Sequence, residues 1–194
     1  YPSVTLRDGQ AMFDVSMEVV NRGGKAMDLM YMAHTNYAYV PDAVFVEPFG
    51  IGRVEVRTSV PAHVHPTEQW QDYIKALKEK PGGLQKLDAP DMYEPEVVSF
   101  LRDVGVDSDG QAHFFLRHPA GEAFYTCYAP AQFTEATRWV LHDPDYHVAG
   151  FVLPATCDPE GYEAEKRKGN VRQLKPGERA EFSIHTGFLS ADEY

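Results

Sequence analysis

The sequence predicts an all-β protein, an antiparallel β-sandwich. Short runs in which apolar and polar residues alternate recur along nearly the whole chain. Turns rich in Gly, Pro and Asp separate these runs, and one segment alone has the apolar spacing of a helix. Many short strands with regular turns and few helices are typical of β-sandwiches.

The first half of the chain begins with a clear strand and a turn. Residues 11–20 alternate, and their apolar face consists of Phe13, Val15, Met17 and Val19. This pattern predicts a half-buried antiparallel strand. Residues 21–24 contain two glycines, which supply the positive φ of tight hairpins. We therefore expect the chain to return through residues 27–40 and to pair with this strand.

A loop, a strand and a helix are expected next. Residues 41–52 are rich in Pro and Gly, and residues 53–60 alternate again as a strand. Thr67 has a side chain that caps helices, and the Pro-Gly-Gly of residues 81–83 ends them. The helix expected between them has an apolar face made of Trp70, Tyr73, Ile74 and Leu77.

The second half of the chain is predicted to be strands and turns. The expected strands are residues 97–104, 113–117, 123–128, 138–142, 147–153 and 179–189. Residues 84–95 are irregular and acidic, which indicates a surface excursion. Residues 156–169 are polar and charged, and we expect them to form a loop. Residues 163–172 mix charges of both signs, which indicates a solvated loop or, alternatively, a lid over a pocket.

Length and charge bound the class of protein. A chain of 194 residues fits one large domain with a sizeable core. A formal net charge of -11 repels phosphate backbones and argues against nucleic-acid binding. The sequence shows neither a transmembrane run nor a signal peptide, so we expect no membrane association and a cytoplasmic location. Cys127 and Cys157 fit neither a disulfide framework nor a zinc spacing.

A stretch of apolar and aromatic residues, 29–40, carries two polar side chains that are two positions apart. These are His34 and Asn36, and residues two apart share one face of a strand. A titratable ring and an amide among aromatic neighbours favour a small polar ligand. The simpler alternative is a sheet histidine with a hydrogen-bond partner.

Three segments resemble one known group of proteins. They are MDLMYMAHTNYAYV (27–40), VLPATCDPEGY (152–162) and LKPGERAEF (174–182). In this order they resemble the aldose 1-epimerase-like proteins of the galactose mutarotase superfamily, and in particular an uncharacterised bacterial branch. The resemblance runs through nearly all of the chain. It implies a large antiparallel sandwich, or supersandwich, with one helix inserted after Pro66.

The resemblance also bears on domain organisation and partners. Residues 1–194 are expected to form a single galactose mutarotase-like domain. Because family members carry further strands before the point that matches Tyr1, we expect this chain to be the C-terminal portion of a longer family domain. The family implies a small-molecule carbohydrate as partner and no cofactor. Because the edge strands of open sandwiches often pair with a second copy, a homodimer is also possible for this chain.

The chemistry that the resemblance implies is acid–base catalysis on a sugar ring. A mutarotase interconverts the anomers of an aldose: an acid protonates the ring oxygen, and a base takes the proton of the anomeric hydroxyl. Histidine suits the acid role because its pKa is near neutral. His34 matches the family's acid, and Asn36 matches the neighbouring substrate-binding position roughly. The family's second histidine has no counterpart in this chain.

The position of the base departs from the family's pattern. Where mutarotases have a glutamate in a late strand, this chain has Leu153, and an aliphatic side chain cannot accept a proton. Glu160 follows within a few residues and is the best substitute, while Glu47 and Glu163 are weaker candidates. The alternative for Glu160 is a solvated loop carboxylate without a catalytic role. A sugar-binding protein without turnover is therefore the alternative to an epimerase.

Four further residues are candidates for contacts with a sugar. Aromatic faces pack against the apolar faces of pyranose rings, which favours Tyr37 and Trp139. Arg138 could donate to hydroxyls or to a carboxylate, and His65 could line the pocket. Tyr37 and Trp139 could instead be core residues of the sandwich. Arg138 could instead form a surface salt bridge.

A metal site is a third possibility. His63 and His65 share one strand face, and Glu68 follows three residues later. Histidine and carboxylate ligands suit a divalent transition metal, as in a metal-dependent sugar isomerase. The spacing is too short for a cupin motif, and no second motif of that kind occurs. A histidine pair in a loop before a helix explains the same residues, so no metal ligand is assigned.

Overall fold

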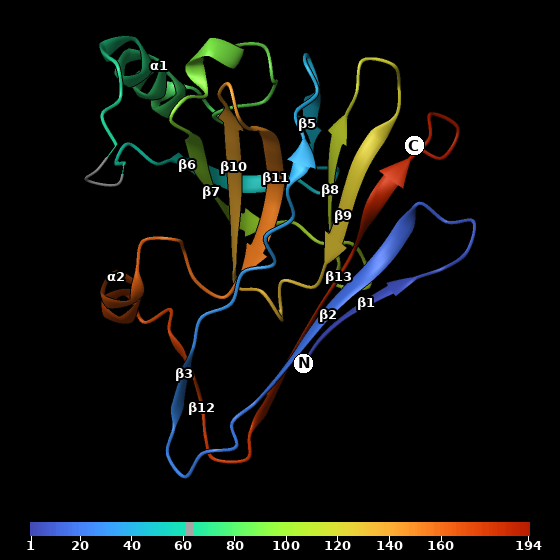
Figure 1. Cartoon of the computed structure of the whole chain (residues 1–194), viewed down its shortest axis with the longest axis vertical. Helices are drawn as coiled ribbons and strands as arrows, with labels where there is room; N and C mark the ends of the chain where they lie inside the picture. The colour runs from blue at the N-terminus through green and yellow to red at the C-terminus, as the bar shows by residue number, and fades with distance from the viewer. Residues whose placement is uncertain (61–63) are drawn as a thin grey trace.

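The computed structural model describes residues 1–60 and 64–194 and confirms the antiparallel β-sandwich (Figure 1). A six-stranded sheet consists, in spatial order, of β1 (Pro2–Leu6), β2 (Met12–Val20), β13 (Arg179–Leu189), β9 (Ala123–Tyr128), β8 (Ala112–Arg117) and β5 (Val44–Val46). A five-stranded sheet consists of β4 (Tyr37–Ala38), β11 (His147–Ala155), β10 (Glu135–His142), β7 (Val97–Val104) and β6 (Ile51–Val56). A separate ribbon, at the bottom of Figure 1, consists of β3 (Met27–Leu29) and β12 (Arg172–Leu174).

The core lies between the two large sheets and follows from the alternation of the strands. From Ala180 to Thr186 of β13, every second residue is buried, and the residues between them are exposed or half-buried. Side chains from both sheets meet in this interior, and aromatic rings provide much of its volume. The fully buried aromatic residues include Tyr93, Phe114, Tyr128, Phe133, Phe151 and Phe182.

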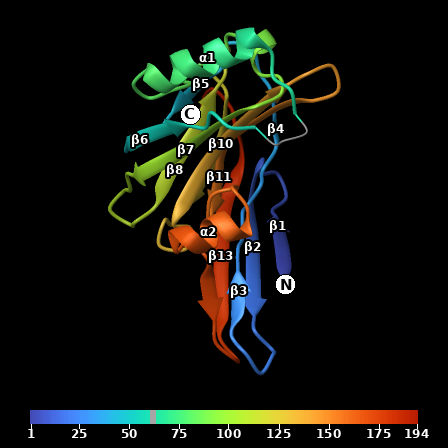
Figure 2. The same ribbon diagram turned by 90° about the vertical axis from the view of Figure 1, so that its left-hand side faces the viewer.

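The predicted helix is confirmed as α1 (Glu68–Glu79). Thr67 caps this helix, because its Oγ1 accepts a hydrogen bond from the backbone N–H of Trp70 at 3.1 Å. Trp70, Ile74 and Leu77 are buried, as the helical spacing of apolar residues requires. The helix lies across one end of the molecule (Figure 2).

A second helix, α2 (Tyr162–Lys168), lies where the sequence predicted only a polar loop. It ends at Gly169, whose φ of +83° is the left-handed conformation of a helix C-cap. Its buried Glu165 accepts a hydrogen bond from the backbone N–H of Asp158 at 2.9 Å. A short 3₁₀ helix, η1, covers Pro90–Met92. Among the residues described, the helices are all too short or too polar to span a membrane.

The pairing expected for residues 27–40 is wrong. β2 pairs with β1 on one side and with β13 on the other, so it has no free edge for that segment. Only two short parts of the segment are strands: β3 pairs with β12, and β4 pairs with β11. The alternation identified β2 correctly, but its partners are the preceding strand β1 and β13 from the far end of the chain.

Candidate functional site

The candidate site lies on the face of the five-stranded sheet that is turned away from the six-stranded sheet. Directly paired residues share a face, and one such row crosses four strands at Leu153, Thr137, Phe100 and Glu55. The opposite face is the inner one, since the Arg138 guanidinium lies there, 3.9 Å from the ring of Phe45 in the six-stranded sheet.

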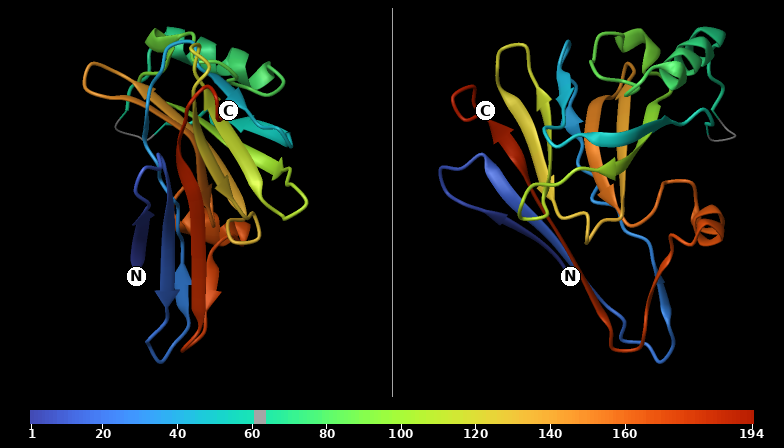
Figure 3. Two further views of the ribbon diagram at one scale, coloured as in Figure 1. Left: turned by 90° about the vertical axis from the view of Figure 1, so that its right-hand side faces the viewer. Right: turned by 180° about the vertical axis from the view of Figure 1, so that it is seen from behind.

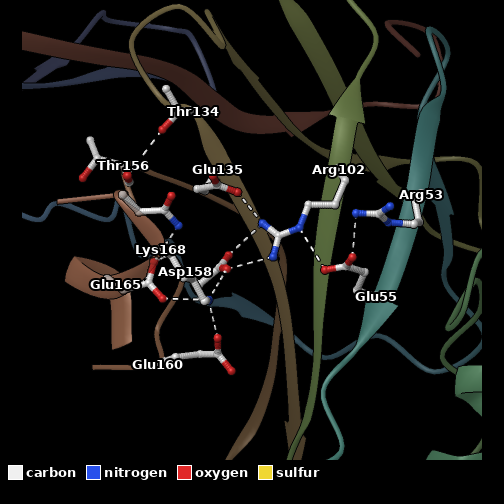
Figure 4. Close-up of polar contacts among 11 residues, drawn as sticks. Arg53, Glu55, Arg102, Thr134, Glu135, Thr156, Asp158, Glu160, Glu165 and Lys168 are labelled. Carbon is white, nitrogen blue, oxygen red and sulfur yellow. Dashed lines mark hydrogen bonds and ion pairs between the residues drawn. The ribbon is translucent and has the colours of Figure 1, made fainter. Parts of the chain in front are cut away.

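This outer face is hollowed between β6, β7 and the segment that carries α2 (Figure 4). The hollow has a volume of about 560 Å³, which is within the usual range of small-molecule sites. Its charged lining comes from four parts of the chain that are distant in sequence. Its charged residues are Arg53, Glu55, Arg57, Arg102, Glu135, Asp158, Glu160 and Lys168.

Arg102 of β7 is the centre of an ion cluster in this hollow (Figure 4). Its two Nη atoms donate to the two carboxylate oxygens of Asp158, each at 2.8 Å, and its Nε donates to Glu55 at 3.1 Å. Glu135 of β10 accepts a further hydrogen bond from the same guanidinium. Although burial opposes it, pairing with Arg102 and Lys168 lowers the pKa of the Asp158 carboxyl. Asp158 and Arg102 therefore form a fixed ion pair at neutral pH.

Lys168, at the end of α2, closes one side of the hollow. Its Nζ donates to Asp158 at 2.9 Å, to Glu165 at 2.8 Å and to Glu160. Oxygen atoms of these three carboxylates lie within 4.8 Å of one another, as the ligands of a metal ion would. Although burial opposes it, the carboxylates raise the pKa of the Lys168 ammonium, which supplies the positive charge among them. The three carboxylates and Lys168 therefore form an ion cluster, in which the ammonium group takes the place that a metal ion would have.

His34 belongs to the loop between β3 and β4, and it is exposed. It lies against the five-stranded sheet, where it contacts Trp139 of β10. Its Nδ1 is 2.7 Å from Oδ1 of Asn36, and its ring makes an edge-to-face contact with the Trp139 indole, with 5.4 Å between ring centroids. The structure thus brings three of the predicted site residues together. Because the amide oxygen accepts, Nδ1 carries a proton, and in the imidazolium form Nε2 carries the second one.

Two residues that the sequence analysis missed link Trp139 to the hollow. Glu96, which directly precedes β7, accepts a hydrogen bond from Trp139 Nε1 at 2.7 Å. The same carboxylate pairs with Arg57, which lines the hollow. Contacts therefore run from His34 through Trp139 and Glu96 to Arg57. Nothing in the local sequence marks them, because strand register alone places these residues side by side.

Leu153 of β11 lies on this face as well. A register shift between β10 and β11 pairs Thr137 with Leu153 and Trp139 with Gly150. A Cβ on Gly150 would be only 3.0 Å from Leu153 Cδ2, so the leucine covers this glycine closely. Leu153 is 1% exposed. A buried aliphatic side chain therefore fills the position where the resemblance places the base.

Arg138 points into the interior, and this placement argues against the predicted contact with a sugar. The residue is 3% exposed, and its Nη1 and Nε donate to the backbone oxygens of Leu84 and Phe151 at 2.9 and 3.2 Å. It also pairs with Glu47, a second candidate for the base, which is thereby committed to an inner ion pair. Burial lowers the pKa of this guanidinium, although Glu47 opposes the effect.

Tyr37 also belongs to the interior rather than to the hollow. Its hydroxyl is 2.6 Å from Oγ1 of the buried Thr186, and its ring stacks on Phe124 with 4.4 Å between centroids. Tyr37 therefore lies in the core between the sheets, which was the alternative to its role as a sugar platform. Burial raises the pKa of its phenol.

The remaining predicted residues are dispersed. His65 is exposed in the segment before α1, and Glu68 is exposed in the first turn of that helix. His63 lies outside the described residues, so the proposed metal ligands are not seen together. Glu160 lines the hollow as expected of a site carboxylate, whereas Glu163 is exposed on α2.

Comparisons with known proteins agree with this architecture. Residues 2–187 match the family model described as "Domain of unknown function (DUF4432)". No curated protein matches the chain significantly. A "putative aldose 1-epimerase" from Klebsiella pneumoniae has a similar structure, with a TM-score of 0.78 at 19% identity. The match covers 99% of this chain and 47% of that one, so this chain spans about half of its length.

Two further solved structures have the same fold. A galactose mutarotase related enzyme from Lactobacillus acidophilus has a TM-score of 0.62 at 13% identity, covering 98% of this chain and 61% of that one. A galactose mutarotase-like protein from Lactobacillus casei has a TM-score of 0.59 at 13% identity, covering 96% and 62%. The chain therefore belongs to the DUF4432 family and has the β-sandwich fold of galactose mutarotase-like proteins.

Proposed function

We propose that the chain binds a neutral monosaccharide in the hollow of the five-stranded sheet. The observation that carries this proposal is the alternation of carboxylates and guanidinium groups over a space of about 560 Å³. Carboxylates accept from pairs of sugar hydroxyls, and guanidinium groups donate to them, so one ring can satisfy both. Phe100 adds an apolar surface to the same lining.

The charge of the hollow favours a neutral sugar over a phosphorylated or acidic one. Each of its four cations already pairs with a carboxylate: Arg53 with Glu55, Arg57 with Glu96, Arg102 with Asp158, and Lys168 with Glu160. Glu135 and Glu165 join the same cluster, so carboxylates outnumber cations. An anionic group on the ligand would compete with these pairs, whereas hydroxyls can share them.

Anomer exchange at this site is the second candidate function, and the position of His34 favours it. An imidazolium beside Trp139 could protonate a ring oxygen through Nε2. The bond between C1 and the ring oxygen then breaks, a carboxylate takes the anomeric proton, and the ring recloses on the other face. Glu160 is the proposed base, since Leu153 cannot act as one.

Sugar binding is tested by titrating the protein with neutral aldoses and with hexose phosphates in isothermal calorimetry. Glu160→Gln removes one carboxylate from the hollow, and we expect it to weaken binding about tenfold. Glu163→Gln, on the exposed side of α2, is the matched control and is expected to bind like the parent protein. Equal affinity in all three proteins, or tighter binding of the phosphates, would contradict the proposal.

Anomer exchange is tested separately by one-dimensional proton NMR on a freshly dissolved single anomer. His34→Gln is expected to reduce any protein-dependent rate by about a hundredfold, because a general acid contributes on that order. Binding should persist in this variant, since His34 lies beside the hollow rather than in its lining. A parent protein that binds sugar without accelerating exchange would leave the first proposal standing and remove the second.

A further inference from the structure

A second hollow adjoins the first one at the end of β7. Its volume is about 390 Å³, which is also within the usual range of small-molecule sites. Three side chains line both hollows: Arg53, Arg102 and Glu135. Much of the remaining lining comes from the end of β7 and from the loop between β9 and β10, which crosses from one sheet to the other (Figure 3). The two hollows are therefore neighbours with a common boundary.

This boundary is a row of charged side chains across three strands. Arg53 of β6 lies directly opposite Arg102 of β7, and Glu55 pairs with both guanidinium groups (Figure 4). Arg102 uses four of its five N–H groups on Glu55, Glu135 and Asp158. Within the described part of the chain, the fifth N–H, on Nη2, has no acceptor. The boundary can therefore still donate to a ligand that lies across it.

Beyond the boundary, the lining of the second hollow combines apolar side chains with two polar groups. Val104 and Pro130 are half-buried, so each keeps part of its apolar surface uncovered. Thr134 is exposed, and its Oγ1 donates to the backbone oxygen of Thr156 at 3.3 Å, so the same atom can still accept. Asp103 is exposed as well and supplies a carboxylate. Apolar walls with a few polar groups suit a sugar ring, whose faces are apolar and whose rim carries hydroxyls.

Asp103 has a backbone conformation that residues other than glycine seldom adopt. Its φ is +54°, in the left-handed region. On the neighbouring strand, a Cβ at Gly52 would be only 2.7 Å from Asp103 Cβ, so this glycine makes room for the aspartate. Strained backbone of this kind is concentrated at functional sites, where the surrounding structure holds it in place. The strain at Asp103 therefore supports a ligand-binding role for the second hollow.

We propose that the two hollows together bind a neutral disaccharide, with one ring in each hollow and the glycosidic bond above Arg102. This inference rests on the proposed function, because the first ring occupies the monosaccharide site. Asp103 and Thr134 accept hydrogen bonds from hydroxyls of the second ring. The remaining N–H of Arg102 donates to an oxygen near the linkage, where both rings are within reach of the shared boundary.

The second binding position is tested by calorimetry with glucose, galactose and mannose, each beside neutral disaccharides that carry it at the reducing end. We expect the parent protein to bind the best of these disaccharides about tenfold more tightly than the monosaccharide alone. Thr134→Trp fills the second hollow, so this variant should bind both sugars with the parent affinity for the monosaccharide. Ala131→Trp changes an exposed residue of the same loop outside the lining, and it should keep the tenfold difference.

A second variant leaves the second hollow open. Asparagine also adopts the left-handed conformation, so Asp103→Asn removes the charge without the shape. We expect it to weaken binding of the disaccharide about fivefold and to leave the monosaccharide unaffected, because Asp103 lines the second hollow alone. Equal losses for both sugars would overturn the inference.

The outcomes separate this inference from the proposed function. A parent protein that binds neither kind of sugar contradicts the proposed function and the inference with it. A parent protein that binds a monosaccharide as tightly as the disaccharides, or a Thr134→Trp variant that keeps the difference between them, overturns the inference and leaves the monosaccharide site standing.

Discussion

Single residues carry the proposed chemistry on the outer face of the five-stranded sheet. His34 packs against the Trp139 indole, and Leu153 covers Gly150, which pairs with Trp139. The candidate acid and the position expected of the base therefore lie next to one aromatic side chain. The sequence identified both positions through the resemblance. It did not reveal that Leu153 is buried, since burial depends on the register of β10 and β11.

Leu153→Glu is expected to increase anomer exchange, because it returns a carboxylate to the sheet face that carries His34. We expect a gain of about a hundredfold over Leu153→Gln, which has nearly the same shape but accepts no proton. Burial should raise the pKa of the new carboxyl, so the gain should grow as the pH rises through that pKa. Proton NMR of the anomers measures both rates, and equal rates would contradict the role given to this position.

At the scale of secondary structure, the ion cluster joins α2 to the five-stranded sheet. Asp158 is 2% exposed and pairs with both Arg102 and Lys168. Its folded pKa lies below the unfolded value, so its contribution to stability is complete above pH about 4 and is lost as the pH falls through the folded pKa. The cluster therefore explains why a charged helix without an apolar stripe folds here.

Asp158→Asn is expected to lower the free energy of unfolding by about 2 kcal/mol at neutral pH, because it removes the buried carboxylate that pairs with the half-buried Arg102 and with Lys168. The difference from the parent protein should shrink below pH about 4, where the parent carboxyl also becomes protonated. Glu181→Gln breaks the exposed pair with Arg179 and should cost less than about 1 kcal/mol. Urea unfolding at several pH values measures these differences, and equal effects of the two variants would contradict the cluster's role.

The elements differ in how far the sequence predicted them. β7 and β13 have the predicted bounds, because alternation between exposed and buried positions is a local property of a strand. α1 was equally clear from Thr67 and its apolar spacing. α2 was missed because five of its seven residues are charged. It is held by Asp158 of the preceding loop, which pairs with Lys168 of α2 and with Arg102 of β7.

At the scale of the whole molecule, the hollow depends on segments that are far apart in the sequence. Arg57 follows β6, Arg102 belongs to β7, Glu135 begins β10 and Lys168 ends α2. No local pattern could group these residues, since sheet order and the position of α2 bring them together. The resemblance led to His34 instead, because that residue lies in a short recognisable segment, whereas Trp139 was predicted only as an aromatic platform for a sugar.

The most direct test of sugar binding follows the indole N–H signals in a proton–nitrogen correlation spectrum. The chain has two tryptophans, Trp139 beside the hollow and the buried Trp70 in α1, and Trp139→Phe assigns the two signals. Added neutral aldose is predicted to move the Trp139 signal saturably while the Trp70 signal moves much less. If neither signal moves with any neutral aldose, or both move equally and without saturation, the hollow does not bind a monosaccharide.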